Sequence, residues 1–316
     1  MRDGLRWNLE AGEQTQYNMD VKVAAHIRRL RVVHASNPTR SQAAATATAT
    51  ASGVEIVATV TPELISACRD QIESQACCVL ANFLPQATLN ELRQEAIHDL
   101  FQLIRPTDDE ETWGPAYSDW VPDSPTFGPD HPRHKRHKTR VDFVGYSSFP
   151  VTSILRRLYE SREMEALVSA LVGERMYKCV DSSRSLNLSV MRNAGDTHGW
   201  HYDSNTAVVS LVLEAPQAGG EFEWAPYSRD EDNENYDEMV QIFDGSSSKT
   251  RRYAPRSGDL VCFKGRRSVH RVAELQAGRR VVALLSFANE PNFYWKHLKA
   301  TKDSPDPSYA ASEPHA

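Results

Sequence analysis

The stretch Leu186-Asn-Leu-Ser-Val-Met191 sets Leu186, Leu188 and Val190 in alternation with Asn187, Ser189 and Met191. A period of two residues is typical of a β-strand, because successive side chains point to opposite faces. Further strand-type runs follow it, at residues 208–213, 221–224, 259–263 and 280–287. Several short strands in succession predict a β-sandwich or barrel in the C-terminal half of the chain.

Helical periodicity dominates the chain before this point. Thr61-Pro62-Glu63 is typical of a helix start, and a capping box predicts a second helix over residues 88–103. An apolar run at 77–84 predicts a strand between them, and residues 151–172 predict a helix pair. We therefore expect helices packed outside the β-barrel.

Two stretches lack periodic runs. Residues 105–150 contain seven prolines and the basic cluster His131–Lys138, and we expect a long irregular segment there. The acidic stretch 229–238 is expected to be a solvated loop, because its carboxylates have no metal-type spacing.

Composition restricts the function classes. The 316 residues carry a net charge of −6, which argues against broad electrostatic capture of nucleic acid. No apolar run approaches the roughly 18–20 residues that span a bilayer, and the first residues lack a secretory apolar region. The five cysteines do not form a disulfide framework, so we expect a protein of a reducing compartment, the cytoplasm. Nothing in the sequence indicates the oligomeric state.

The N-terminal region has a composition of its own. Residues 21–54 contain no acidic side chain, and Val23, Ile27, Leu30 and Val33 form one face of a predicted helix. Residues 1–54 are therefore either a disordered extension or an organelle-targeting segment. We predict one catalytic domain over residues 55–295 and a C-terminal tail over 296–316.

The chemistry-bearing residues lie among the predicted strands. His201 and Asp203 are two residues apart, so a strand would place both side chains on one face. His270 follows a later strand. Two histidines and one carboxylate form the facial triad of non-haem Fe(II) oxygenases, which leaves metal positions open for a co-substrate and dioxygen. The alternative is that both histidines are surface or hydrogen-bonded core residues.

A 2-oxo acid bound at such a metal needs a cation for its distal carboxylate. Arg280 opens the last apolar strand, and a guanidinium suits a carboxylate bidentately. Arg279 points to the opposite face of a regular strand and is the competing candidate.

The order of these motifs resembles a known family. His201-x-Asp203, Gly219-Gly220-Glu-Phe, Gly258-Asp259, His270-Arg-Val and Gly278-x-Arg280 resemble the prolyl-hydroxylase-like Fe(II)/2-oxoglutarate dioxygenases. A closer resemblance, through His198-x-Trp200-His201 and Asn235-Tyr236, is to the free amino acid radical halogenases and their hydroxylase relatives. It implies an α+β fold with a double-stranded β-helix (jelly-roll) core flanked by N-terminal helices. It also implies iron at His201, Asp203 and His270, and 2-oxoglutarate at Arg280.

The residue at position 203 separates two activities within that group. A halogenase replaces the carboxylate ligand with a small residue to make room for halide, whereas this chain keeps Asp203. The resemblance therefore implies an oxidoreductase that hydroxylates its substrate and releases succinate and carbon dioxide.

The substrate residues are less defined by the sequence. The resemblance places a substrate contact at His198, for which a supporting hydrogen bond near the metal is the alternative. Arg133 and Arg140 are candidates for binding a substrate carboxylate, against a solvated basic loop. Asp181 is a candidate partner for a substrate ammonium group.

We expect the partner of this enzyme to be a small molecule, a free amino acid or a derivative, with Fe(II), 2-oxoglutarate and O2. The first alternative is a protein or peptide hydroxylase of the prolyl type. A non-enzymatic alternative is a nucleic-acid-binding or scaffold protein that uses residues 131–138 and the basic N-terminal region.

Overall fold

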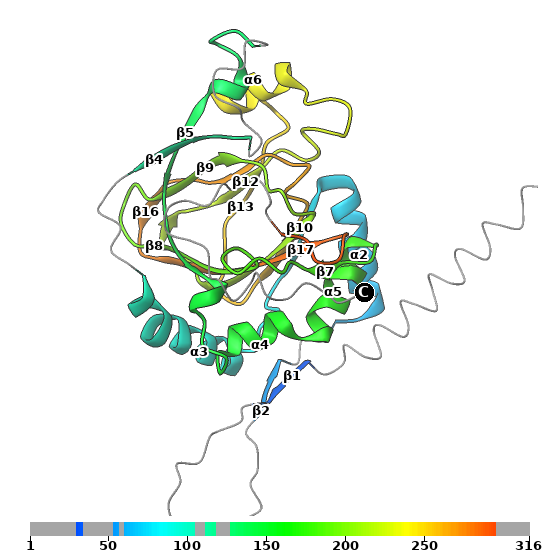
Figure 1. Ribbon diagram of the computed structural model, residues 1–316, viewed down its shortest axis with the longest axis vertical. Coiled ribbons are helices and arrows are strands. Elements are labelled where there is room, and N and C mark those ends of the chain that lie inside the picture. The colour runs from blue at the N-terminus through cyan, green and yellow to red at the C-terminus, as the bar shows by residue number, and fades with distance from the viewer. Residues whose placement is uncertain (1–29, 34–52, 57–59, 105–110, 118–126, 295–316) are drawn as a thin grey trace, which may run out of the picture.

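Two antiparallel sheets face each other in the computed structural model, which describes residues 30–33, 53–56, 60–104, 111–117 and 127–294 (Figure 1). The larger sheet contains, in spatial order, β3 (Cys77–Leu80), β14 (Leu260–Phe263), β10 (Ala207–Glu214), β17 (Arg280–Ala288), β8 (Leu186–Met191) and β6 (Asp142–Gly145), with β7 (Tyr177–Lys178) also paired to β17. The smaller sheet contains β13 (Arg251–Tyr253), β12 (Phe222–Trp224), β15 (His270–Val272), β9 (Thr197–His201), β5 (Arg136–Arg140) and β4 (Thr112–Pro115).

The chain crosses repeatedly between the two sheets. β8 lies in the larger sheet, β9 in the smaller, β10 in the larger, β12 and β13 in the smaller, β14 in the larger, β15 in the smaller and β17 in the larger. Two short pairs complete the strands: β1 (Leu30–Val33) with β2 (Gly53–Ile56), and β11 (Ala218–Gly219) with β16 (Leu275–Ala277). This crossing order is that of a jelly roll, so the predicted double-stranded β-helix is confirmed.

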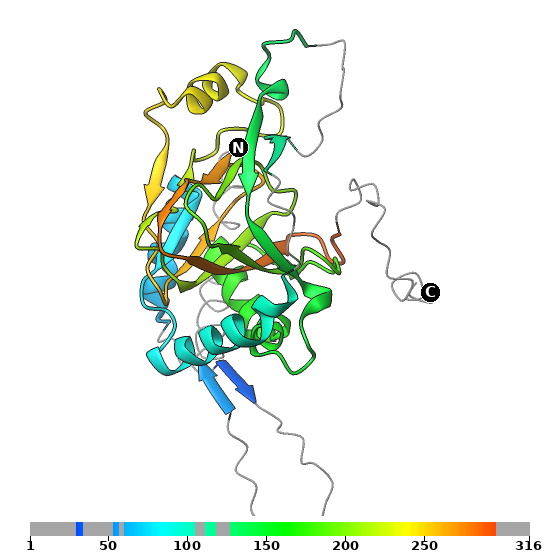
Figure 2. The ribbon, with the colours of Figure 1, turned by 90° about the vertical axis from the view of Figure 1, so that its left-hand side faces the viewer.

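Helices cover the outer face of the larger sheet, as Figure 2 shows from the side. They are α2 (Pro62–Gln75), α3 (Gln86–Gln94), α4 (Ile154–Glu160) and α5 (Arg162–Val172), with a π-helical turn η1 (Glu95–Leu100) and a 3-10 turn η2 (Phe101–Leu103) after α3. At the opposite end of the molecule, α6 (Tyr236–Asp244) packs against η3 (Pro132–His134). A further 3-10 turn, η4 (Tyr146–Ser148), lies beside α4, where the Tyr146 ring contacts the Tyr159 ring.

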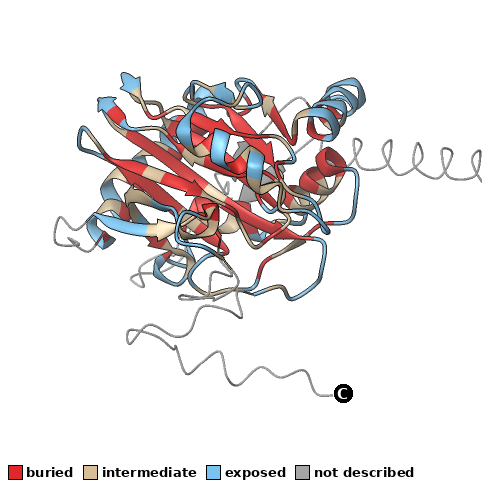
Figure 3. Ribbon diagram, turned by 90° about the horizontal axis from the view of Figure 1, so that it is seen from above, coloured by how far each residue is buried: buried red, intermediate tan, exposed pale blue. Residues whose placement is uncertain are grey.

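Strand alternation divides the buried side chains into two sets. Leu186, Leu188 and Val190 join the helices in the largest apolar cluster, so Asn187 and Ser189 face the space between the sheets. Figure 3 shows these central strands as the most continuously buried part of the molecule. Next to β8, the space between the two sheets is therefore more polar than the space between the larger sheet and the helices.

A buried carboxylate joins two of the helical segments. The Glu95 Oε1 atom accepts a hydrogen bond from the Ile154 amide at 2.7 Å, and Oε2 accepts from the Leu155 amide at 3.1 Å. These amides belong to the first turn of α4, where backbone N–H groups lack helical partners and a negative charge is stabilised. Glu95 therefore caps α4 and links it to η1, the π-helical turn that begins at Glu95.

Several local predictions are confirmed, and others are wrong. Thr61 caps α2 as predicted, and its Oγ1 accepts from the Leu64 amide. The capping box at Thr88 is wrong, because α3 starts at Gln86 directly after Pro85, and Thr88 is buried within it. Proline has a helix-compatible φ and no N–H to satisfy, so it can precede the first turn.

The irregular segment predicted over residues 105–150 is wrong for the part that the structure describes. β4, β5 and β6 lie there, and β4 and β6 are edge strands of the two sheets. Strands in such positions form by backbone pairing and need no apolar alternation, which explains why the pattern missed them. The helix α6 also begins inside the acidic stretch that was expected to be a loop.

The terminal predictions are tested only in part. Leu30–Val33 forms a strand rather than the end of the predicted amphipathic helix. Residues 1–29, 34–52 and 296–316, on which the extension, targeting and tail predictions rest, lie outside the described residues. In the described ranges, no helix combines the length and apolar character that a membrane span requires.

β9 contains an irregularity that matters for the site. His201 is paired with His270 on β15, but His198 is paired with Val272, so three steps on β9 match two on β15. Such a β-bulge reverses the inward and outward alternation along one strand. Gly199 lies at this bulge, close to β5: a Cβ there would be 2.6 Å from both the His137 Cβ and the Lys138 carbonyl oxygen.

We expect Gly199→Ala to lower the free energy of unfolding by about 1–3 kcal/mol, since the added methyl group must push β5 away from β9. Urea unfolding measures the change. Gly114→Ala on β4 is the matched control, because a Cβ there has nothing within 4 Å and should change stability by less than about 0.5 kcal/mol. Equal midpoints for the two variants would contradict the close packing at Gly199.

Candidate metal centre

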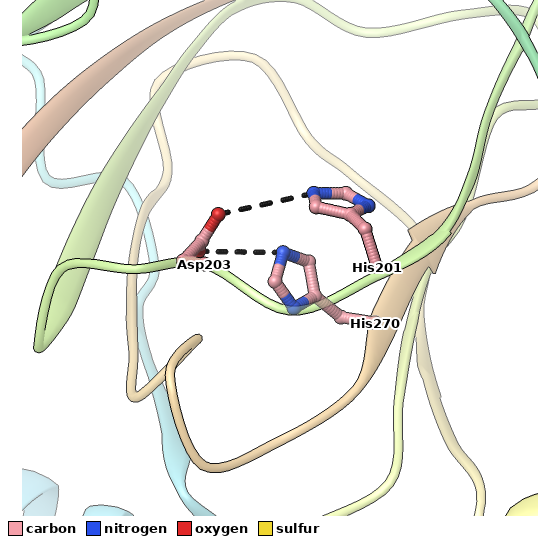
Figure 4. Close-up of side chains that lie close together, drawn as sticks. All are labelled: His201, Asp203 and His270. Atoms are coloured by element: carbon pink, nitrogen blue, oxygen red, sulfur yellow. Dashed lines mark ion pairs between the residues drawn. The ribbon is translucent and has the colours of Figure 1, made fainter. Parts of the chain in front are cut away.

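His201, Asp203 and His270 point toward one another between the sheets (Figure 4). Their ligand atoms all lie within 4.8 Å of one another. The Asp203 Oδ1 atom is 3.9 Å from His201 Nε2, and Oδ2 is 3.4 Å from His270 Nε2. The elements differ from the prediction in one respect: β9 ends at His201, so Asp203 lies in the turn beyond the strand.

The backbone fixes both imidazoles in the same way. His201 Nδ1 is 2.7 Å from the Gly199 carbonyl oxygen, and His270 Nδ1 is 2.9 Å from the Ser268 carbonyl oxygen. A carbonyl oxygen only accepts hydrogen bonds, so each Nδ1 carries the proton. Each Nε2 is thereby turned toward Asp203, and in the neutral imidazole with this tautomer Nε2 is the nitrogen that binds a metal.

Electrostatics keep His201 neutral. Burial, and secondly the nearby His270, lower the pKa of His201 to about 4, although Asp203 and the Gly199 carbonyl act in the opposite direction. At neutral pH this imidazole is therefore uncharged and free to act as a ligand. The aromatic rings of Phe263 and Phe222 lie 4.9 and 5.8 Å from the His270 ring and limit its access to water.

The position of Asp203 depends on a glycine that sequence reasoning missed. The Asp203 amide donates to the Gly265 carbonyl at 3.2 Å, and a Cβ on Gly265 would be 1.9 Å from Asp203 Oδ2. That Oδ2 is buried and, within the described residues, has no hydrogen-bond partner. A buried carboxylate oxygen of this kind is costly unless a ligand satisfies it.

The donor set fits iron. Two imidazole nitrogens and the Asp203 carboxylate, whose Oδ2 atom is unsatisfied, match the facial triad of non-haem Fe(II) enzymes. Neither thiolates nor a fourth protein ligand join the group among the residues that the structure describes, in contrast to structural zinc sites.

Arg280 and Arg279 have different environments. Arg279 pairs with Glu214 at 2.6 Å and lies over the Phe101 ring. Arg280 is 5% exposed, and its Nε atom has no hydrogen-bond partner in the described part of the chain. Burial lowers the pKa of Arg280 to about 10, so the guanidinium stays charged at neutral pH. Such a buried cation fits the distal carboxylate of 2-oxoglutarate.

A glycine makes room for this arginine. Gly220 has a φ of +68°, and a Cβ there would be 3.3 Å from the Arg280 Cδ atom. Gly220 in the Gly219-Gly220 motif therefore has a packing reason, because it keeps the space around the guanidinium stem open, whereas a Cβ on Gly219 would meet the Glu274 carbonyl oxygen.

His198 lies at the metal site because of the bulge in β9. A regular strand would turn it away from His201, but the two rings stack with their centroids 4.0 Å apart. The Phe143 ring on β6 contacts His198 edge-on at 5.7 Å and is 43% exposed. Burial, and then the neighbouring imidazoles of His201 and His270, hold the pKa of His198 well below its usual range, so this imidazole is also neutral.

The arginines predicted in the irregular segment have carboxylate partners of their own. Arg133 donates to the Tyr236 hydroxyl at 2.7 Å, pairs with Glu234, and lies over the Tyr117 ring. Arg140 pairs with Asp196 at 3.2 Å. Asp181 accepts hydrogen bonds from the Ser183 amide and hydroxyl and from the Arg184 amide, so its carboxylate closes a turn.

A surface cavity of about 400 Å³ lies elsewhere, on the outer side of the smaller sheet. Trp200, Arg252 and Arg271 are among its lining side chains, and none of the three metal-type residues lines it. It is therefore distinct from the His–Asp–His site.

We expect Gly265→Ala to weaken divalent metal binding by about 10–100-fold, the usual effect of disturbing a group that orients a ligand. The added methyl group would occupy the position of Asp203 Oδ2. Titration with Co(II), followed by its visible absorption, measures the affinity. Gly128→Ala, where the added carbon has nothing within 4 Å, is the control and should bind metal normally. An unchanged affinity in Gly265→Ala would contradict this packing.

Comparison with known proteins gives one family match. The halogenase D family matches residues 144–305, more than half of the chain. No curated protein matches. Similar solved structures include the non-haem α-ketoglutarate-dependent epimerase SnoN from nogalamycin biosynthesis, which is 15% identical, with a TM-score of 0.49 over 78% of this chain and 91% of that one.

Two further structures are similar in the same range. AviO1 from Streptomyces viridochromogenes Tue57 is 16% identical, with a TM-score of 0.49 over 71% of this chain and 94% of that one. A Pseudomonas putida prolyl-4-hydroxylase is 12% identical, with a TM-score of 0.43 over 72% and 99%. The family match covers residues 144–305, and these residues contain the His–Asp–His centre. The chain therefore belongs to the halogenase D family and is an Fe(II)/2-oxoglutarate-dependent oxygenase.

Proposed function

We propose that this enzyme hydroxylates a small, amino-acid-like metabolite. The reaction consumes 2-oxoglutarate and dioxygen and releases succinate and carbon dioxide. The observation that carries the proposal is the Asp203 carboxylate, which faces His201 and His270 and completes a three-residue ligand set.

The roles of the residues follow from their environments. His201 and His270 present Nε2 toward the metal position, and Asp203 supplies the anionic ligand. Arg280 binds the distal carboxylate of 2-oxoglutarate. Bound Fe(II) and 2-oxoglutarate supply the oxidant that removes a substrate hydrogen and returns a hydroxyl group. The protein positions the substrate and limits water through the aromatic wall of Phe222 and Phe263.

The carboxylate favours hydroxylation over halogenation, despite the name of the family. A halide bound to the metal would need the position that the Asp203 side chain fills. Gly265 packs directly against Asp203, and this contact holds the carboxylate toward the two histidines. The amino-acid-like substrate class is supported by the resemblance of the His198-x-Trp200-His201 motif to the free amino acid radical halogenases and their hydroxylase relatives.

Anaerobic reconstitution tests this function. Addition of Fe(II) and 2-oxoglutarate should produce a metal-to-ligand charge-transfer band, and a screen of free amino acids under oxygen should find one that increases succinate release. Asp203→Gly should reduce hydroxylation by more than about 100-fold, because even a residue that merely orients a ligand contributes 10–100-fold. Unchanged hydroxylation by this variant, or chlorination by the wild-type enzyme, would contradict the proposal. A band with a response to peptides alone would indicate a peptide hydroxylase.

Arg280→Gln should raise the KM for 2-oxoglutarate about 30-fold or more, since truncating one partner of a buried charge pair costs about 2–5 kcal/mol. Thermal stabilisation of the protein by 2-oxoglutarate should fall in parallel. Arg279→Gln is the matched control on the neighbouring residue, and it should leave the KM close to that of the wild type because Arg279 pairs with Glu214. A larger effect of Arg279→Gln than of Arg280→Gln would reverse the two assignments.

A further inference from the structure

Tyr202 and Val269 lie at the same end of the strand pair that carries the two histidines of the metal centre. β9 ends at His201 and β15 begins at His270, and these two residues are paired in antiparallel strands. Tyr202 follows one ligand and Val269 precedes the other, so both lie where the ladder stops. Asp203 is one residue further along, and the pairing of β9 with β15 does not extend to it.

The Ser228 hydroxyl joins these two extensions. Its Oγ atom accepts a hydrogen bond from the Val269 amide at 2.8 Å and lies 2.9 Å from the Tyr202 hydroxyl. The Tyr202 hydroxyl is also 3.2 Å from Met239 Sδ, and donation to the sulfur with acceptance from Ser228 satisfies both hydroxyls. Ser228, Tyr202 and Val269 are all buried, so water does not compete for these bonds. One buried side chain therefore connects the two segments that carry the ligands.

Ser228 is itself fixed by the backbone on either side. The Tyr227 amide donates to Ser268 Oγ at 3.1 Å. The Arg229 amide donates to the Arg267 carbonyl at 3.2 Å. Tyr227 has a φ of +46°, a left-handed conformation that tyrosine rarely adopts and that persists only where the surroundings impose it. The Ser228 hydroxyl therefore has a defined position from which to hold its partners.

The Tyr202 side chain is held as firmly as the serine. The centroids of the Tyr202 and Tyr117 rings are 5.4 Å apart, and the guanidinium carbon of Arg229 lies 3.9 Å from the centre of the Tyr202 ring. The Tyr202 amide donates to the Ala116 carbonyl at 2.8 Å. Because the ring is held, the position of its hydroxyl and that of the backbone between the two ligands of this segment are linked.

We propose that Ser228 is a positioning residue for the metal centre, whose hydroxyl sets the spacing between the two segments that carry the three ligands. It acts through Tyr202 and Val269, on the α6 side of the smaller sheet, and not by contact with a ligand. Groups that orient metal ligands in this way typically contribute about 10–100-fold to metal affinity. This inference rests on the metal assignment in the proposed function, to which it adds a residue outside the ligand set.

Titration of the full chain with Co(II), followed by its visible absorption, tests the inference. Ser228→Ala removes the acceptor of the Val269 amide and one partner of the Tyr202 hydroxyl, so the Kd for Co(II) should rise about tenfold or more. The visible bands of bound Co(II) should also change in position or intensity, because they report the geometry of the ligands. Tyr202→Phe removes only the hydroxyl of the ring and should weaken binding in the same direction.

The double variant separates one shared bridge from two unrelated effects. Ser228→Ala and Tyr202→Phe break the same hydrogen bond, so their effects on the Kd should be non-additive. The double variant should then bind Co(II) about as weakly as Ser228→Ala alone.

Ser169→Ala is the matched control. The Ser169 Oγ atom also forms a bridge, since it accepts from the Met176 amide at 3.0 Å and donates to the Glu165 carbonyl at 2.8 Å, but it belongs to α5. Both serine variants should lower the melting temperature of the metal-free chain by about 2–4 °C, because each loses a bridging hydroxyl. Only Ser228→Ala should change the affinity and the spectrum of Co(II).

A Kd within about twofold of the wild type in Ser228→Ala or Tyr202→Phe, or additive effects in the double variant, would overturn the inference. An equal loss of affinity in Ser169→Ala would also overturn it, because lowered stability would then account for the effect. Absence of Co(II) binding by the wild-type chain would contradict the metal assignment itself and with it both proposals. Normal wild-type binding without amino-acid-stimulated succinate release would contradict only the proposed substrate class and would leave the role of Ser228 standing.

Discussion

The metal centre depends on the register between β9 and β15. Antiparallel pairing sets His201 opposite His270, and a slip of one residue would turn one imidazole out of the barrel. The bulge at Gly199 then brings His198 to the same side, although a regular strand would turn it away. A feature of backbone pairing, rather than of side-chain chemistry, therefore decides which polar groups share the interior.

The site also contains two polar atoms that the fold leaves unsatisfied. Asp203 Oδ2 and Arg280 Nε are buried without a hydrogen-bond partner among the described residues, whereas the buried Glu95 carboxylate binds two amides with its two oxygens. Buried unsatisfied groups destabilise a folded chain, and native proteins contain few of them. Ligands bound at these two positions, which we propose for the metal and the co-substrate, would therefore stabilise the folded chain as well as enable its chemistry.

The sequence predicted the features that have a strong local signature. Alternation at residues 186–191 indicated a central strand, and the His–x–Asp spacing with a distant histidine indicated the ligand set that the structure brings together. The strands within residues 105–150 carry mostly polar side chains, so no periodicity marked them. Gly265 was missed because it reaches the site only through a tertiary approach, which no spacing along the chain encodes.

The place of β17 in the larger sheet has a consequence for how the protein is made. It is the last strand of the described chain, yet it lies between β10 and β8 and carries Arg280 at its start. During synthesis the sheet has an open centre until residue 288 has left the ribosome, because both neighbouring strands wait for a partner about 70 to 100 residues downstream. Closure of the sheet and placement of Arg280, which we propose binds 2-oxoglutarate, are therefore the same late event.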